Sequence, residues 1–109
     1  MKASWVGIAA AALLLAGQAN AADVEAGKLA FETSICKGCH ALETAGFGPS
    51  MLLIGRKYAT VEGAKEIMTK KVNRGSRGQW GPDNAMPSQK GNISNENLSA
   101  ILDYVLSLK

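Results

Sequence analysis

The segment Cys36-Lys37-Gly38-Cys39-His40 constrains this chain more than any other feature of its sequence. The whole chain has two cysteines and one histidine, and all three stand in these five residues. Any chemistry that uses all three side chains must therefore take place on one short segment of the chain. Three uses fit this spacing: a redox-active dithiol, a structural zinc site and covalent attachment of haem.

The number and kinds of metal-binding and redox-active residues in the chain favour haem attachment. A Cys-x-x-Cys dithiol usually lies in a βαβ unit, and no segment here alternates as a strand does. A structural zinc ion needs four ligands, and two cysteines with one histidine fall short. In c-type attachment both thiols add to the vinyl groups of one porphyrin edge, and the next histidine binds the iron. We expect Cys36 and Cys39 to form thioethers and His40 to be the proximal ligand.

The N-terminal segment has the features of a secretory signal peptide. Lys2 precedes an apolar run over residues 5–16, and small residues follow at 19–21. The run is shorter than the roughly 20 residues of a membrane-spanning helix, although an uncleaved anchor is the alternative. We expect cleavage after Ala21, export to the periplasm and no stable membrane insertion afterwards.

Residues 22–109 would then form a single small domain. The formal net charge of +3 falls to +2 when Lys2 is removed. So small an excess argues against nucleic acid as a partner, since nucleic-acid binding uses a strong basic patch.

Helical periodicity predicts four helices in this domain. The first covers residues 23–35, with Asp23 as its N-cap and with Val24, Leu29 and Ile35 on its apolar side. No segment has the alternation of a strand, so we expect an all-α fold.

The other three helices have candidate caps. Ser50 would cap a short second helix, Thr60 a third that ends before Gly75, and Ser94 the last. Between the third and last helices, residues 75–92 have no periodicity and contain four glycines and two prolines. A loop of that length is usually functional or wraps a bound group.

That loop contains the best candidate for the sixth iron ligand. With one histidine in the chain, the second axial ligand is a methionine or the position is open. Met68 lies on the apolar side of a predicted helix, and Met51 follows His40 too closely to reach the opposite haem face. Met86 is followed by Pro87, which stiffens the backbone beside it, so we expect Met86 to bind the iron.

Several motifs together resemble a known family. They are "CKGCH", "GFGP" ending at Pro49, "RGSRGQWGPDNAMP" and the closing "LDYVLSLK". Over residues 22–109 the chain resembles the class I cytochromes c, and most of all the small bacterial cytochrome c-551 family, also called c8. The resemblance implies an all-α class I cytochrome c fold, with about four helices around one covalently bound haem c.

The resemblance also implies roles for individual residues. The carbonyl of Pro49 would accept a hydrogen bond from the second ring nitrogen of His40. Trp80 would bind a haem propionate, and Lys71 stands where the family often has an arginine facing one. Phe31 and Tyr104 resemble the aromatic pair at the crossing of the first and last helices.

One stretch departs from the family pattern. The residues between Trp80 and Met86, "GPDNA", are one residue longer than the usual spacing, and Asp83 and Asn84 replace more apolar residues. The path of the loop that carries Met86 is therefore the least predictable part of the site.

With both axial positions filled by the protein, the expected function is one-electron transfer at high potential, without enzymatic activity. The resemblance suggests a monomeric carrier between donors such as a bc1-type complex and acceptors such as a nitrite reductase, a cytochrome c peroxidase or a terminal oxidase. Basic side chains would steer acidic partners; the candidates are Lys37, Arg56, Lys57, Lys70, Lys71, Arg74 and Arg77. The alternatives are a gas-binding haem sensor or small haem enzyme with a labile sixth ligand, and an electron-transfer subunit of a larger complex.

Overall fold

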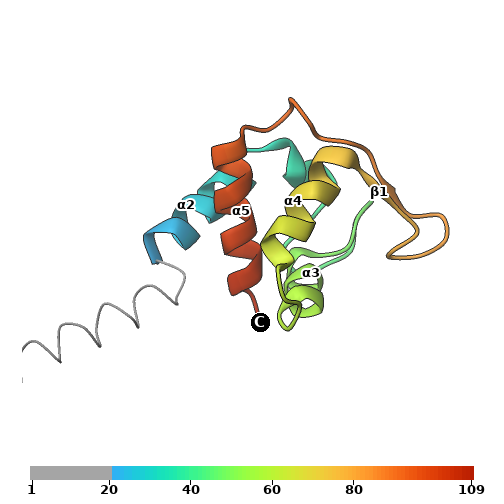
Figure 1. Cartoon of the computed structure of the whole chain (residues 1–109), viewed down its shortest axis with the longest axis horizontal. Helices are drawn as coiled ribbons and strands as arrows, with labels where there is room; N and C mark the ends of the chain where they lie inside the picture. Colours follow the sequence, from blue (N-terminus) through green and yellow to red (C-terminus); the bar gives the residue numbers. More distant parts are fainter. Residues whose placement is uncertain (1–20) are drawn as a thin grey trace, which may run out of the picture.

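The structure, a computed structural model of the chain, describes residues 21–109 (Figure 1). Apart from its last residue, the predicted signal peptide lies outside this range. The described elements are α2 (Ala21–Glu32), a 3₁₀ helix η1 (Ile35–Gly38), α3 (Met51–Tyr58), α4 (Ala64–Arg74), β1 (Ser76–Arg77), β2 (Ala85–Met86) and α5 (Asn95–Ser107). The expected helical fold is confirmed, and a small two-stranded sheet is added to it within the 75–92 loop.

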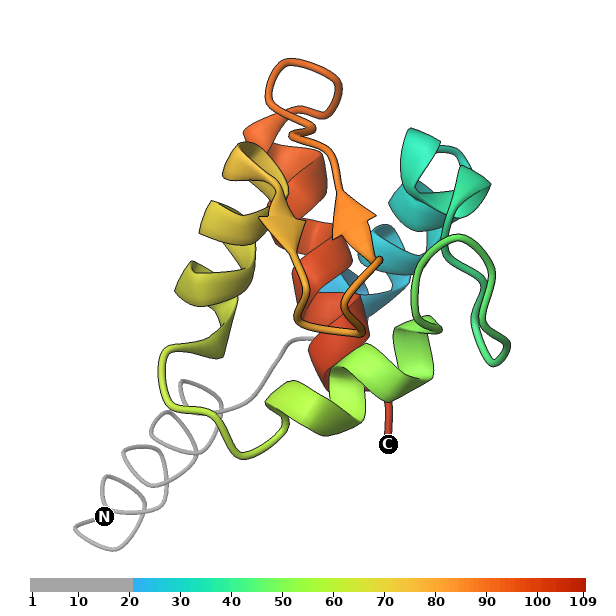
Figure 2. The ribbon, with the colours of Figure 1, turned by 90° about the vertical axis from the view of Figure 1, so that its right-hand side faces the viewer.

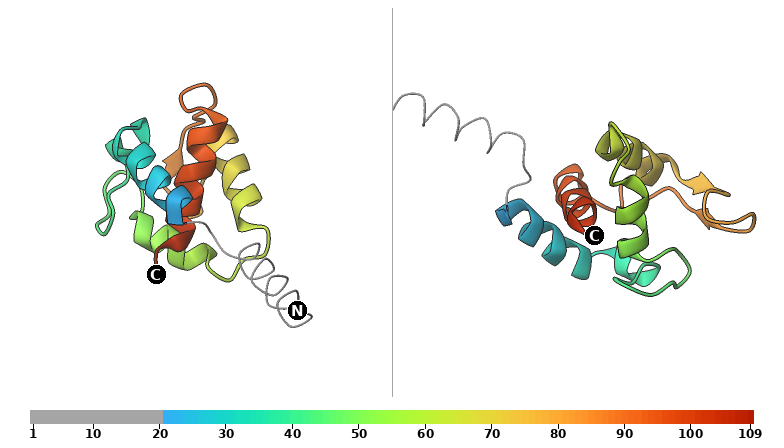
Figure 3. Two further views of the ribbon diagram at one scale, coloured as in Figure 1. Left: turned by 90° about the vertical axis from the view of Figure 1, so that its left-hand side faces the viewer. Right: turned by 90° about the horizontal axis from the view of Figure 1, so that it is seen from below.

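The first and last helices, α2 and α5, pack closely across each other (Figure 3). A Cβ atom placed on Gly27 would lie 1.9 Å from the carbonyl oxygen of Ala100, so only glycine fits at this point of the crossing. Beside it, the rings of Phe31 and Tyr104 lie 6.3 Å apart between centroids, tilted by 39°. The predicted aromatic pair is therefore confirmed, and it belongs to the hydrophobic core.

The predicted apolar side of the first helix is wrong in part. The helix ends at Glu32 and not at Ile35, which begins η1 and is 55% exposed; within residues 23–32, Leu29 is 64% exposed and Gly27 and Phe31 are buried. Helix α2 meets α5 through Gly27, which turns Leu29 away from the contact, and Ile35 is no longer part of this helix. Asp23 is not the N-cap either, because the helix begins at Ala21 and Asp23 lies in its first turn.

The caps predicted for α3 and α5 are confirmed. The Ser50 hydroxyl accepts a hydrogen bond from the backbone N–H of Leu53 at 3.1 Å, and the Ser94 hydroxyl accepts one from Asn97 at 3.1 Å. Each satisfies an N–H group that would otherwise lack a partner at the start of a helix. The apolar face of α5 then supplies much of the core through Leu98, Ile101, Leu102 and Val105.

The start of α4 differs from the prediction. The residue before the helix is Gly63, with φ of 71°, and not Thr60. A left-handed backbone is readily adopted by glycine, which lets the chain turn sharply after α3. At the other end, Gly75 follows α4 as predicted, and its N–H donates to the carbonyl of Lys71. Met68 is 5% exposed and packs in the core, as expected.

The hairpin of β1 and β2 projects away from α2 and α5, and the chain after β2 runs back to the start of α5 (Figures 1 and 3). Its two strands pair antiparallel, with Ser76 opposite Met86. Two further hydrogen bonds tie the loop to the end of α4: the N–H of Gln89 donates to Val72, and the hydroxyl of Ser88 donates to Asn73. No helix within residues 21–109 is long and apolar enough to span a bilayer.

Candidate functional site

The Cys-x-x-Cys-His segment forms a single compact turn. The Ser34 hydroxyl caps η1 by accepting from the N–H of Cys36 at 3.2 Å. The N–H groups of Cys39 and His40 then both donate to the carbonyl of Cys36, at 3.2 and 3.0 Å. Cys36 is half-buried, Cys39 is exposed, and both thiols are free. The turn therefore presents two thiols and one imidazole from the same short piece of chain.

The imidazole of His40 is held by the backbone that follows the turn. Its Nδ1 lies 2.7 Å from the carbonyl oxygen of Pro49. A carbonyl can only accept, so Nδ1 carries the proton, and Nε2 keeps a free lone pair. A Cβ atom on Gly48 would lie 2.6 Å from the His40 ring, so a glycine is required where the chain passes the imidazole. The quoted "GFGP" motif contains this glycine, but its contact with the ring was not foreseen.

Met86 lies on the short strand β2 and is half-buried. The residue opposite it in the sheet is Ser76, two residues after the end of α4. A Cβ atom on Gly75 would lie 2.8 Å from the carbonyl oxygen of Met86, so the backbone of this strand passes close to the end of α4. The predicted ligand is thus on a paired strand and not on a free loop tip.

A hydrogen bond joins the loop of Met86 to the segment that follows His40. The side-chain amide of Asn84 donates through Nδ2 to the carbonyl oxygen of Phe47 at 3.2 Å. Asn84 was noted in the sequence only as a departure from the family spacing. No local sequence signal indicates this contact, because its partners are 37 positions apart.

Trp80 contacts a residue that the sequence analysis had considered only as a surface charge. The ammonium group of Lys57, in the last turn of α3, lies 4.6 Å from the centroid of the Trp80 ring. Such a cation over an indole face is an attractive contact. Lys71, the expected partner of a propionate, is half-buried in the last turn of α4.

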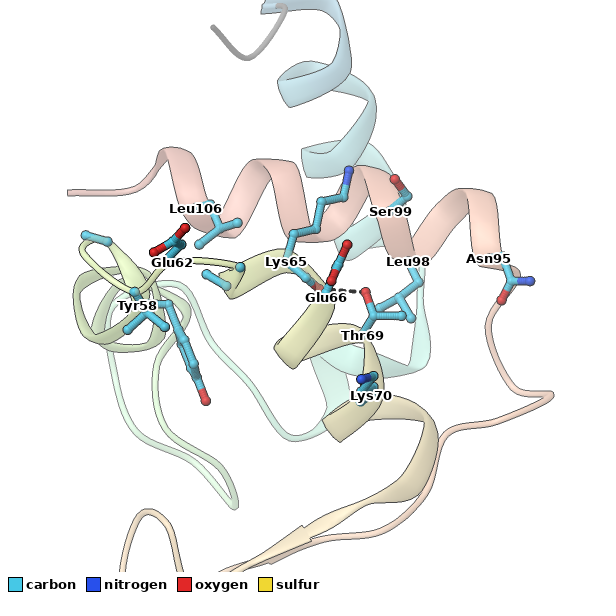
Figure 4. Close-up of a pocket in the computed structure, with 14 residues that line it drawn as sticks. Tyr58, Glu62, Lys65, Glu66, Thr69, Lys70, Asn95, Leu98, Ser99 and Leu106 are labelled. Carbon is cyan, nitrogen blue, oxygen red and sulfur yellow. Dashed lines mark hydrogen bonds between the residues drawn. The ribbon is translucent and has the colours of Figure 1, made fainter. Parts of the chain in front are cut away.

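A surface groove lies elsewhere, between α4, α5 and the turn after α3 (Figure 4). Its lining includes Tyr58, Thr69, Leu98 and Leu106, and an ion pair of 2.9 Å joins Lys65 at its edge to Asp103 of α5. None of the predicted site residues lines this groove. The chemistry indicated by the sequence therefore lies outside it.

The residues brought together at the Cys36–His40 turn fit haem c. Two free thiols are separated by two residues, and the imidazole beside them has its Nδ1 proton engaged and Nε2 free for a metal. Within residues 21–109 there is no group of three or more His, Cys, Asp or Glu side chains that could hold another metal ion. A single iron porphyrin, attached at the thiols, accounts for this donor set.

Comparison with known proteins agrees with this chemistry. Residues 24–109 match the cytochrome c family. Cytochrome c-552 of Nitrosomonas europaea is 37% identical over 110 residues, which span the whole of both chains. Cytochrome c-551 of Stutzerimonas stutzeri is 32% identical over 83 residues, which are 76% of this chain and 77% of that one.

The fold agrees as well. The crystal structure of wild-type Nitrosomonas europaea cytochrome c552 superposes with a TM-score of 0.67 at 34% identity, covering 73% of this chain and 96% of that chain. Sequence, fold and donor set thus lead to one conclusion. The chain belongs to the cytochrome c family, the small monohaem electron carriers that hold haem c covalently.

Proposed function

We propose that this protein is a periplasmic one-electron carrier in which Cys36 and Cys39 hold the haem as thioethers and His40 and Met86 bind its iron. The observation that carries this proposal is the hydrogen bond of 2.7 Å between His40 Nδ1 and the Pro49 carbonyl. A bound haem supplies reversible exchange of one electron at its iron. The chain itself must hold both ligands in place and must keep other molecules from binding to the metal.

On the proximal side, Pro49 and Gly48 position the imidazole. The Pro49 carbonyl fixes the tautomer, so Nε2 of His40 is the nitrogen available to the iron. A hydrogen bond to the other ring nitrogen also makes the imidazole a stronger donor. Gly48 lets the backbone lie against the ring, which limits its rotation.

For the second iron ligand, the burial of the other two methionines of residues 21–109 supports Met86. Met51 and Met68 are 4% and 5% exposed and pack in the core. Met86 is half-buried on a strand paired with β1, and Pro87 follows it. A thioether held in this way would leave no vacant position at the metal and would keep the same two ligands in both oxidation states.

We assign Pro49, Trp80 and Lys71 to the haem environment. The indole N–H of Trp80 is a donor suited to a propionate, and Lys71 supplies positive charge from the end of α4. The ammonium group of Lys57, 4.6 Å from the centroid of the Trp80 ring, adds a second positive charge beside this indole and so supports the assignment.

A visible spectrum tests the ligands. We expect the ferrous protein to have a low-spin c-type spectrum that carbon monoxide leaves unchanged. Met86→Ala should open the sixth position, so that carbon monoxide shifts the spectrum. Met68→Leu is the control, since it replaces a core methionine of similar volume. A shift in the unmodified protein would favour the gas-binding sensor or small haem enzyme, and the absence of a c-type spectrum would contradict the cofactor assignment.

We also propose that residues 1–21 are a signal peptide that is removed on export. The charged start, the apolar run and the small residues at 19–21 support it. The test is the mass of the haem-containing protein recovered from the periplasm of a host that attaches haem. It should begin at Ala22; a retained N-terminus, or recovery with the membrane fraction, would contradict the proposal.

The distribution of charge supports an acidic redox partner. Residues 56–77 contain seven basic and two acidic side chains, whereas the rest of residues 21–109 contain four basic and seven acidic ones. This basic segment includes α4, which lies on the opposite side of the molecule from η1 (Figure 2). Partners with an acidic docking surface fit it; by family resemblance these are a bc1-type donor and a nitrite reductase, cytochrome c peroxidase or terminal oxidase as acceptor.

The partner proposal is tested by rates at different ionic strengths. Lys70→Glu combined with Arg74→Glu reverses two exposed charges of the basic segment and should slow transfer to an acidic partner most strongly at low salt. The control is Lys90→Glu with Lys109→Glu, which makes the same change in net charge at exposed positions outside the segment. Equal effects of the two pairs would contradict a role for the basic segment.

A further inference from the structure

The hydrogen bond between Asn84 and Phe47 has a special place in the fold. Among residues 21–109 it is the one hydrogen bond between residues 41–50, which follow His40, and residues 75–92, which contain Met86. Its donor is the side-chain amide of Asn84 and its acceptor is a backbone carbonyl, at 3.2 Å. Because a carbonyl cannot donate, the NH₂ group of the amide, and not its oxygen, must face Phe47.

The backbone of Asn84 is bound into the strand that carries Met86. Its N–H donates to the carbonyl of Gly81 at 3.1 Å, and its own carbonyl accepts from the N–H of Gly78 at 2.8 Å. The next two residues, Ala85 and Met86, pair with β1. The position of the Asn84 side chain is therefore coupled, through the backbone, to the strand that carries Met86 two residues further along.

The Phe47 end is bound to the surroundings of His40. The N–H of Gly48 donates to the carbonyl of Cys39 at 2.9 Å, and the carbonyl of Pro49 accepts a hydrogen bond from the His40 imidazole. The Phe47 side chain is 85% exposed, so packing of the ring does not fix this residue. Its position depends on backbone contacts, and the bond from Asn84 is one of them.

From this arrangement we propose that Asn84 is a positioning residue that latches the Met86 strand to the His40 segment. The inference rests on the function proposed above, in which His40 and Met86 bind the iron from its two sides. The latch keeps the two ligand-bearing segments at a fixed separation. Without it, residues 78–86 move more freely, and a competing ligand displaces the Met86 sulfur more readily.

The sharpest variant is Asn84→Asp, in the haem-containing protein. It keeps the shape of the side chain but removes the NH₂ donor and places a carboxylate beside a carbonyl oxygen. Asn84→Ala removes the donor without adding charge. The matched control is Asn92→Asp, which makes the same change in the same loop, where the amide of Asn92 donates within the loop to Gln89 at 3.3 Å.

Two readouts are needed. The first is titration of the ferric protein with imidazole. Binding is monitored as the loss of the red charge-transfer band of the methionine–iron bond. The second is hydrogen exchange of the Gly78 amide, which reports on the loop without reference to the iron. One partly exposed hydrogen bond contributes modestly, so we expect both Asn84 variants to bind imidazole about 2- to 10-fold more tightly, and the Gly78 amide to exchange faster by a similar factor.

The outcomes separate this inference from the proposed function. Tighter imidazole binding and faster Gly78 exchange in both Asn84 variants, with Asn92→Asp unchanged, would support the latch. Unchanged exchange in the Asn84 variants, or equal effects of Asn92→Asp, would overturn it. If the unmodified protein lacks the methionine band, the assignment of Met86 fails, and the exchange measurement alone then decides whether Asn84 ties the two segments together.

Discussion

The crossing of α2 with α5 and the loop of residues 75–92 are stabilised in different ways. At the crossing, Gly27 lets two backbones approach closely, and the rings of Phe31 and Tyr104 are buried beside it. The loop has two strands of two residues each, five backbone hydrogen bonds outside that sheet, and a few from side chains. Its largest apolar side chains, Trp80 and Met86, are only half-buried.

This difference indicates which part of the fold a bound haem would stabilise. At the crossing, apolar side chains pack against other parts of the same chain, and these contacts supply most of the stability of this region. The loop leaves Trp80 and Met86 partly exposed, and in the proposed site a bound haem would be their packing partner. We expect substitutions at the crossing to change the free energy of unfolding, and substitutions in the loop to change local opening and ligation.

The two phenylalanines of the chain give the largest contrast. Phe31 is 4% exposed at the crossing, and Phe47 is 85% exposed in the segment that the loop contacts. Phe31→Ala should lower the free energy of unfolding by about 3–5 kcal/mol, because it leaves a cavity in the core. Phe47→Ala should change it by less than about 0.5 kcal/mol. Guanidinium unfolding of the two proteins measures the difference, and similar losses would break the comparison.

Gly27 tests the close approach of the backbones. Gly27→Val places a side chain against the carbonyl of Ala100 and should cost about 3 kcal/mol, because the helices must separate. Ala26→Val is the matched control: it adds a β-branched side chain at the neighbouring, exposed position of α2. It should cost only about 0.5 kcal/mol of helix propensity. Thermal unfolding distinguishes the two, and a tolerated Gly27→Val would show that the contact is loose.

Ser88 tests the attachment of the loop to α4. Its hydroxyl donates to the carbonyl of Asn73, and both the hydroxyl and the loop around it are exposed. Ser88→Ala should therefore cost no more than about 1 kcal/mol in the free energy of unfolding. Amide exchange should quicken in residues 86–92 and stay unchanged in α2 and α5. Faster exchange throughout the protein would show that the loop and the crossing open together.

The smallest effect concerns alkaline pH. Burial raises the pKa of the Tyr104 hydroxyl above its usual value, Glu32 and Glu25 add to the rise, and Lys28 opposes it. The folded state thus holds this proton more tightly than the unfolded state does, so the stabilisation is complete below pH about 10 and is lost as the pH rises further. Tyr104→Phe should make the loss of stability above pH about 10 shallower. An identical pH profile would show that Tyr104 ionises freely in the folded protein.

The parts of the fold that were predictable depend on local physics. Ser50 and Ser94 were identified as caps because a cap needs only a hydroxyl three residues before a free N–H. The haem-attachment turn was identifiable because its three reactive side chains lie within five consecutive residues. By contrast, Thr60 was the wrong cap, since the sharp turn at Gly63 displaced the start of α4.

The parts that were not predictable depend on contacts between distant residues. Leu29 follows an apolar pattern yet is exposed, because the close approach at Gly27 decides which face of α2 is buried, and Ile35 is exposed in η1 beyond the end of that helix. The contacts of Asn84 with Phe47 and of Lys57 with Trp80 join segments far apart in the chain, and no local pattern around either residue of a pair indicates its partner. Spacing and composition contain no information about such pairs.

The order of the helices along the chain has a consequence for how the protein matures. The two partners of the crossing, α2 and α5, are the first and the last described elements. In a chain exported N-terminus first, the Cys36–His40 turn leaves the membrane well before α5, so the crossing cannot form until translocation is nearly complete. Closing so long a stretch of chain also costs the most entropy of any contact in the fold. If the chain is exported and its haem is attached as proposed, the two thiols would be accessible during that interval on a chain whose first and last helices have not yet packed together.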